Sequence, residues 1–78
     1  MYDCDKRMIE VIEYLIAQKK VKNKRWFCLS IDMTPETYYK ILKGINHFTT
    51  VQIQKTCDLY KVNANYIFGI EDNMFYKK

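Results

Sequence analysis

The segment "SIDMTPETYYKILKG", residues 30–44, decides the fold because it carries two chemically different stripes on one predicted helix. After Thr34 an apolar set recurs at the spacing i, i+3, i+4 and i+7 and comprises Tyr38, Ile41, Leu42 and Ile45. A polar set with the same spacing lies about 200° round the helix. It comprises Glu36, Tyr39, Lys40 and Lys43. We expect the apolar set to enter a core, which leaves the polar set to be explained.

Both ends of this helix carry terminal signals. Thr34 followed by Pro35 is typical of a helix start, since a threonine oxygen caps free N–H groups and proline suits the first turn. Gly44 is typical of the position just past a helix end. The pattern therefore predicts a helix from Pro35 to Lys43.

The segments before it predict two further helices. We expect one over residues 5–18, with a core face made of Ile9, Ile12, Leu15 and Ile16. Residues 19–24 form a connector in which Val21 points inward. Asn23 caps a short helix over residues 24–31, whose inward residues are Phe27, Cys28 and Ile31.

The segments after it predict two more. Thr49 and Gln52 have capping-box spacing, and the helix that they open has the core candidates Val51, Ile53, Cys57 and Tyr60. Asn63 caps a last helix over residues 64–68, which Gly69 ends. Residues 70–78 have no clear pattern, and strand alternation is absent throughout. The fold class is therefore all-α, with five short helices in one domain covering residues 1–78.

Composition limits the class of protein. With 49% hydrophobic residues in a 78-residue chain, a core forms without metal or disulfide support. No apolar run approaches the roughly 20 residues that span a membrane, and the start "MYDCDKRMIE" is unlike a signal peptide. We therefore expect a cytoplasmic protein without a membrane partner. The preference for lysine over arginine is typical of an AT-rich bacterial or phage genome.

The cysteines indicate buried thiols. Cys4, Cys28 and Cys57 lie far apart and form no C-x-x-C pair, which favours a reducing compartment over a disulfide framework. With His47 they make four nominal zinc ligands, but they lack the paired spacing of a structural site, so we expect no metal. No Ser/His/Asp, Cys/His or paired-carboxylate arrangement is present. The sequence predicts no enzyme, no cofactor and no small-molecule ligand.

Positive charge is concentrated in one third of the chain. Between Lys19 and Lys43, seven basic and two acidic residues give +5, whereas the remainder, with six basic and seven acidic residues, gives −1. Such a patch is the electrostatic footprint of a polyanion partner. Lys24 and Arg25 lie in a first helical turn, where the helix dipole disfavours cations by about 0.3–1 kcal/mol. A bound phosphate resolves this conflict; the alternative is an ordinary solvated charged face.

The spacing from residue 24 to residue 43 is that of a helix-turn-helix. That motif needs a small buried residue, a turn residue able to adopt a positive φ, and two inward anchors in the second helix. These structural positions fall on Cys28, Asp32, Tyr38 and Ile41.

On these residues the chain resembles the lambda-repressor-like, Xre/Cro-type DNA-binding domains over residues 6–69. The resemblance rests on "F-C-x-x-I-D-M-T…Y-x-x-I-x-x-G" in residues 27–44 and on "LYKVNANYIFG" in residues 59–69. The chain departs from the family at Lys24 in place of glutamine, at Cys28 in place of alanine and at Asp32 in place of glycine. The connector before Asn23 is also about one residue longer than is usual for such domains.

The resemblance implies that residues 35–43 form the recognition helix in the major groove of double-stranded DNA. Its base-reading candidates are Thr34, Glu36, Thr37, Tyr39 and Lys40. Glu36 would accept from cytosine or adenine, Lys40 would donate to guanine, and Tyr39 would contact a thymine methyl group or a phosphate. The phosphate candidates are Lys22, Asn23, Lys24, Arg25, Lys43, Asn46 and His47. Trp26 either seats on the sugar-phosphate backbone or packs at the edge of the domain.

The expected function is sequence-specific DNA binding by a small prokaryotic or phage transcriptional regulator, a repressor that binds a two-fold operator as a homodimer. The dimer would use the last helix and the tail, through Phe68, Ile70, Met74, Phe75 and Tyr76. Alternatively, these residues close the core of the monomer. The alternative function is an antitoxin or a protein-interaction module that has kept the fold, supported by Glu36 and the adjacent Tyr38 and Tyr39.

Overall fold

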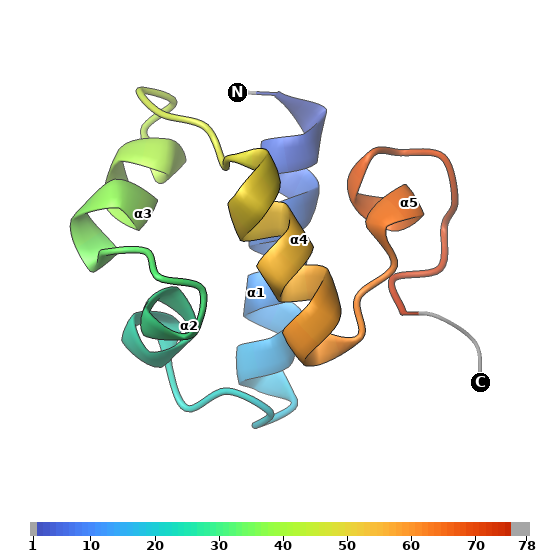
Figure 1. Ribbon diagram of the computed structural model, residues 1–78, viewed down its shortest axis with the longest axis horizontal. Coiled ribbons are helices and arrows are strands. Elements are labelled where there is room, and N and C mark those ends of the chain that lie inside the picture. Colours follow the sequence, from blue (N-terminus) through green and yellow to red (C-terminus); the bar gives the residue numbers. More distant parts are fainter. Residues whose placement is uncertain (1, 76–78) are drawn as a thin grey trace.

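The computed structural model describes residues 2–75, and helices make up nearly all the regular secondary structure there. They are α1 (Asp3–Ala17), α2 (Lys24–Ser30), α3 (Pro35–Leu42), α4 (Thr50–Tyr60) and α5 (Ala64–Ile67). In the view of Figure 1, α2 and α3 lie on one side of α4 and α5 lies on the other. The prediction of a helical domain with five helices is confirmed for the described residues. None of these helices is long and apolar enough to cross a membrane.

Side-chain caps start four of the helices, at the residues that the sequence predicts. The capping oxygens belong to Asn23, Thr34, Thr49 and Asn63, and each accepts a bond from a backbone N–H two or three residues further on. At α4 the capping box is complete, since the Thr49 N–H also donates to Oε1 of Gln52 at 2.9 Å.

The helix bounds differ slightly from the predicted ones. α1 begins at Asp3 rather than at residue 5, while α1, α2, α3 and α5 each end one residue early. The residues that follow α2, α3 and α5 still donate a backbone bond into the helix but serve as its C-cap.

The core forms where α1 packs against α2 and α5, α2 packs against α3, and α4 packs against α5. Met8, Val11, Ile12 and Leu15 of α1 are fully buried. The predicted Ile9 and Ile16 are half-buried at the edge of this core, so the face of α1 is rotated from the expected one. Val21 is buried, as the pattern of the connector predicts.

Two predicted core residues around the end of α3 are exposed. Leu42 is 36% exposed and Ile45 is 65% exposed, so placing them in the core was wrong. The physical reason is that α3 ends at Leu42 and that Gly44, with φ +78°, turns the chain away from the helical path. Helical spacing therefore does not extend to Ile45, and Phe48 supplies the next buried side chain.

A similar correction applies to α4. Val51 is 57% exposed rather than buried. Ile53 is buried as predicted, and Thr56 is fully buried as well. The hydroxyl of Thr56 tolerates burial because it donates to the Gln52 carbonyl at 2.8 Å.

The C-terminal segment divides between core and surface. The Asn63 N–H donates to the Met74 carbonyl at 2.8 Å, and Val62 forms an isolated antiparallel bridge with Phe75. Met74 and Phe75 pack against the core and thus help to close the monomer. Phe68 and Ile70 remain 54% and 73% exposed. Tyr76, the last member of the predicted dimer set, lies outside the described residues.

Candidate nucleic-acid interface

The polar stripe of α3 lines a surface hollow of about 550 Å³. The lining residues are Pro35, Glu36, Tyr39, Lys40, Lys43 and Ile45, which include every member of the stripe. The hollow forms because α3 contributes one face and the turn at Gly44 folds Ile45 back beside it. The predicted helical spacing thus gathers these side chains at one place on the surface.

The hollow combines an apolar floor with charged groups. The Tyr39 ring is 58% exposed, and the Lys43 ammonium lies 4.4 Å from the centre of that ring. Among the described residues, Glu36 and Lys40 form no ion pair and no side-chain hydrogen bond with another residue. One carboxylate acceptor and one ammonium donor are therefore available to an external group beside a cation already fixed over an aromatic ring.

The two threonines at the start of α3 are partly occupied by its cap. Oγ1 of Thr34 accepts from the Thr37 N–H at 3.2 Å and lies 2.9 Å from Oγ1 of Thr37. Both residues stand at the predicted helix entry. Both hydroxyl groups already take part in the hydrogen bonds that cap α3, so a base could bond to them only in addition to those bonds.

Three predicted residues of α2 and α3 are buried, and the turn between these helices contains the predicted residue of positive φ. Cys28, Tyr38 and Ile41 are 1%, 4% and 0% exposed. Asp32 adopts φ 56°, in the left-handed region that the turn requires. Its carboxylate forms an ion pair with Lys55 of α4, which joins the turn to the next helix.

At the start of α2 the two cations differ. Nζ of Lys24 lies 3.3 Å from Oε1 of Glu13 in α1 and 6.0 Å from the centre of the Tyr38 ring. The Glu13 carboxylate therefore balances the charge of Lys24 from within the protein, and a bound phosphate is not needed for that purpose. Arg25 is exposed and has no ion-pair partner among the described residues, so the dipole argument for a phosphate still holds for Arg25.

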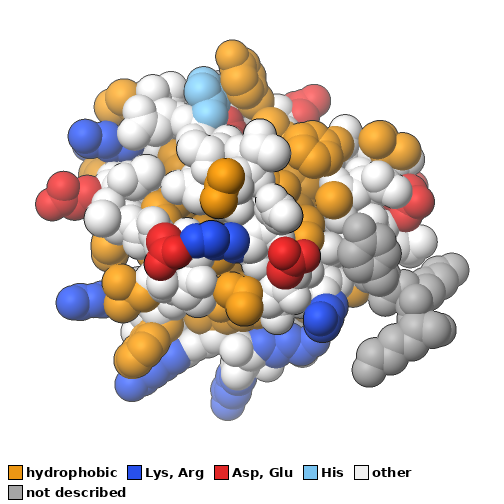
Figure 2. All heavy atoms as spheres, viewed as in Figure 1, with side chains coloured by type: hydrophobic (Ala, Val, Ile, Leu, Met, Phe, Trp, Pro, Cys, Tyr) orange, Lys and Arg blue, Asp and Glu red, His pale blue; other side chains and the backbone are white. Residues whose placement is uncertain are grey.

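The basic connector lies beside these residues. Lys22 and Asn23 are exposed, and the Asn23 side chain is occupied by its cap on the Trp26 N–H. Trp26 is 54% exposed, so about half of its surface is accessible to an external group and the rest is covered by the domain. Lys and Arg side chains gather along the lower edge of Figure 2, where Figure 1 places the connector between α1 and α2.

Tyr38 carries a buried hydroxyl without a hydrogen-bond partner among the described residues. Burial raises the pKa of Tyr38 to about 12, and the neighbouring charges of Glu13 and Cys28 act in the same direction. The ring thus anchors α3 while its hydroxyl remains unsatisfied, a cost of about 1–3 kcal/mol for a buried polar group.

His47 is held by a buried carboxylate that the sequence does not reveal. Its Nδ1–H donates to Oδ2 of Asp5 at 2.6 Å, and the Phe48 N–H donates to Oδ1 of Asp5 at 3.0 Å. The Tyr2 ring stacks on the imidazole with 4.0 Å between centres. Because Asp5 is fully buried, these bonds fix the loop between α3 and α4 to α1. Only the other ring nitrogen of His47 remains for a phosphate; Asn46, beside it, is half-buried.

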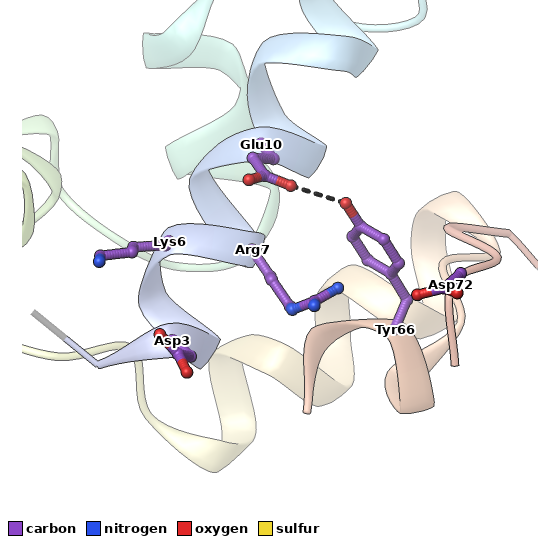
Figure 3. Close-up of a pocket in the computed structure, with 6 residues that line it drawn as sticks. All are labelled: Asp3, Lys6, Arg7, Glu10, Tyr66 and Asp72. Carbon is purple, nitrogen blue, oxygen red and sulfur yellow. Dashed lines mark hydrogen bonds between the residues drawn. The ribbon is translucent and has the colours of Figure 1, made fainter. Parts of the chain in front are cut away.

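A second hollow, of about 450 Å³, lies between α1 and α5 and contains acidic and basic groups (Figure 3). The Tyr66 hydroxyl donates to Oε2 of Glu10 at 2.6 Å, and the Arg7 guanidinium lies 4.9 Å from the Tyr66 ring centre. The bond to Glu10 is the main cause that raises the pKa of Tyr66. The bond from Tyr66 to Glu10 and the contact of Arg7 with the Tyr66 ring both join α5 to α1, so we interpret the hollow as a polar contact between these helices.

None of the three cysteines forms a disulfide. All three are free, and burial raises the pKa of Cys28 and of Cys57, which disfavours their thiolates. Within residues 2–75, no three His, Cys, Asp or Glu side chains lie close enough to hold a metal ion.

No family model, curated protein or solved structure matches this chain. The case for a function therefore rests on the residues and their geometry. Of the candidates from sequence, the stripe of α3 is brought together, while the start of α2 and the loop at His47 are partly occupied by internal partners.

Proposed function

We propose that the chain is a lambda-repressor-like, helix-turn-helix protein that binds double-stranded DNA in a sequence-specific way and acts as a small bacterial or phage repressor. In this proposal α2, the turn at Asp32 and α3 form the motif, and α3 enters the major groove. One observation carries the proposal: the polar stripe of α3 lines a single exposed hollow in which Glu36 and Lys40 have no internal partner among the described residues.

The chemistry of that hollow suits a base edge beside a phosphate. Lys40 would donate to an acceptor such as guanine O6 or N7, and Glu36 would accept from an exocyclic amino group. Lys43 and Arg25 would contact phosphates and position α3, since phosphate contacts fix the register of a protein on the duplex. Occupying a promoter in this way would exclude polymerase, which requires no effector domain.

We further propose that the DNA-bound form is a homodimer. Phe68 and Ile70, the exposed members of the predicted dimer set, would form its contact. The domain is 34 Å in its longest dimension. A two-fold operator requires the two α3 helices of such a dimer to lie one DNA turn, about 34 Å, apart. Sedimentation at increasing concentration should show a dimer that Ile70→Lys weakens.

The salt dependence of binding to a mixed-sequence duplex tests the proposal. Affinity should fall steeply between about 50 and 200 mM salt, since binding to phosphates releases counterions. Replacing Arg25 or Lys43 by alanine should each lower the slope of log K against log salt by about 1. Lys61→Gln, which removes a cation beyond the end of α4, should leave the slope unchanged. Binding that is insensitive to salt, or equally affected by all three variants, would contradict the proposal.

A protein-interaction module or antitoxin is the second candidate. Its support is the exposed apolar surface at the end of α3, where Tyr39, Leu42 and Ile45 are 58%, 36% and 65% exposed. Such a contact would depend on these three side chains and little on salt. Loss of partner binding in Tyr39→Ala, together with no retention of DNA at low salt, would favour this candidate.

A further inference from the structure

We propose that the apolar floor of the α3 hollow seats the 5-methyl group of thymine and so makes the protein select thymine at that position. This inference rests on the proposed DNA-binding function and specifies which base chemistry the hollow reads. The inference rests on Tyr39 and Ile45, which line the hollow and are unusually exposed for large apolar side chains, at 58% and 65%.

Ile45 is fixed in its exposed position by the backbone. Its N–H donates to the Lys40 carbonyl at 2.9 Å, and the Gly44 N–H donates to the Ile41 carbonyl at 3.0 Å. These two bonds close the end of α3 and keep Ile45 beside the hollow instead of allowing it to turn inward. An aliphatic side chain whose backbone is held at the surface in this way is suited to an apolar contact with an external partner.

The charges around the floor restrict what that partner is. Lys40 and Lys43 line the same hollow, and the Lys43 ammonium is held 4.4 Å from the centre of the Tyr39 ring. Glu36 lines the hollow as well, so an occupant fits that presents an anion to the lysines, a donor to the Glu36 carboxylate and a small apolar group to the floor. In the major groove of DNA the thymine methyl group is the apolar group next to the phosphate backbone, and side chains recognise it by apolar contact.

The size of the effect follows from the area that one methyl group buries. Removing one such contact should weaken binding about fourfold. A duplex of alternating adenine and thymine and the same duplex with deoxyuridine in place of thymine differ only in these methyl groups. Comparing the two duplexes measures the methyl contact directly and does not require the operator sequence.

Fluorescence anisotropy at low salt should show wild type binding the thymine duplex more tightly than the deoxyuridine duplex, by about fourfold for each subunit bound. In Ile45→Ser this preference should disappear. Leu59→Ser, which removes a 56% exposed aliphatic side chain from α4, serves as the matched control and should retain the preference. Circular dichroism confirms that both variants are folded.

Equal binding of the two duplexes by wild type would overturn the methyl site while leaving DNA binding intact. A preference that survives in Ile45→Ser would also overturn it, because duplex shape rather than the hollow would then be the cause. Failure to bind either duplex, even at low salt, would instead refute the proposed function on which the inference rests.

Discussion

The ammonium group of Lys24 lies 3.3 Å from a carboxylate oxygen of Glu13, so the first turn of α2 is paired with the middle of α1. Both side chains are about half exposed, at 52% and 55%. Such a pair is stabilised by about 1 kcal/mol at most. It nevertheless competes directly with a phosphate for the same ammonium group.

Replacing Glu13 should therefore strengthen DNA binding. Glu13→Gln leaves Lys24 without its internal partner, and we expect affinity at low salt to rise up to about fivefold. Glu10→Gln is the matched control, because it removes the same charge from α1 at a residue that bonds Tyr66 instead. An equal rise in the two variants, measured by anisotropy, would show that only net charge matters.

Tyr38→Phe should stabilise the domain. The substitution removes a buried hydroxyl without a partner among the described residues, so unfolding in urea near pH 8 should require about 1 kcal/mol more free energy. A destabilised variant would mean that the hydroxyl has a partner.

The same variant tests the pH dependence. Since burial raises the pKa of Tyr38 in the folded state to about 12, the unfolded chain loses this proton first as the pH rises above 10. The titration of Tyr38 therefore leaves the free energy of unfolding unchanged below pH 10 and lowers it as the pH rises from 10 to about 12. Wild type should lose more stability than Tyr38→Phe across that window. If the free energies of unfolding of wild type and Tyr38→Phe changed in parallel across this pH range, the raised pKa of Tyr38 would be contradicted.

Asp5 should be the most sensitive polar position. Asp5→Ala leaves the Phe48 N–H and the His47 ring without an acceptor, and we expect a loss of about 2–3 kcal/mol in urea denaturation. His47→Ala should cost less, because the Phe48 bond remains. The double variant should cost less than the sum of the two, since both single changes break the same bond. Strict additivity would show that the 2.6 Å contact between Asp5 and His47 contributes nothing.

The turn residue Asp32 gives a test of backbone conformation. Because its φ is 56°, Asp32→Ala should destabilise the domain by about 1 kcal/mol, whereas Asp32→Gly should be close to neutral. Both variants also lose the ion pair with Lys55, so Lys55→Ala is the control and should cost about 0.5 kcal/mol or less. Equal losses in the alanine and glycine variants would locate the effect in the ion pair.

Local signals in the sequence were sufficient for the existence of the five helices and for the starts of α2, α3, α4 and α5, but not for the start of α1. Thr34 with Pro35, the capping box at Thr49 and the amide caps at Asn23 and Asn63 each act within three residues, so their geometry is readable from spacing alone. The positive φ at Asp32 and the gathering of the α3 stripe followed from spacing in the same way.

Tertiary features were not readable. The partners Asp5 and His47 are 42 residues apart, and no local pattern links them. The exposure of Ile45 depended on where α3 ends, and helical periodicity does not determine that point. Glu13 gave no signal as the partner of Lys24, because the crossing of α1 and α2 brings the two together.

The most direct test of the central proposal is selection of bound duplexes from a random-sequence pool at moderate salt, followed by sequencing. If α3 reads base edges from two subunits, an inverted repeat whose half-sites lie about one helical turn apart should be enriched. The triple variant Glu36→Ala, Tyr39→Ala and Lys40→Ala should retain DNA without that motif, since Arg25 and Lys43 remain to contact phosphates. Absence of any retained duplex with wild type, even at low salt, would contradict the proposal.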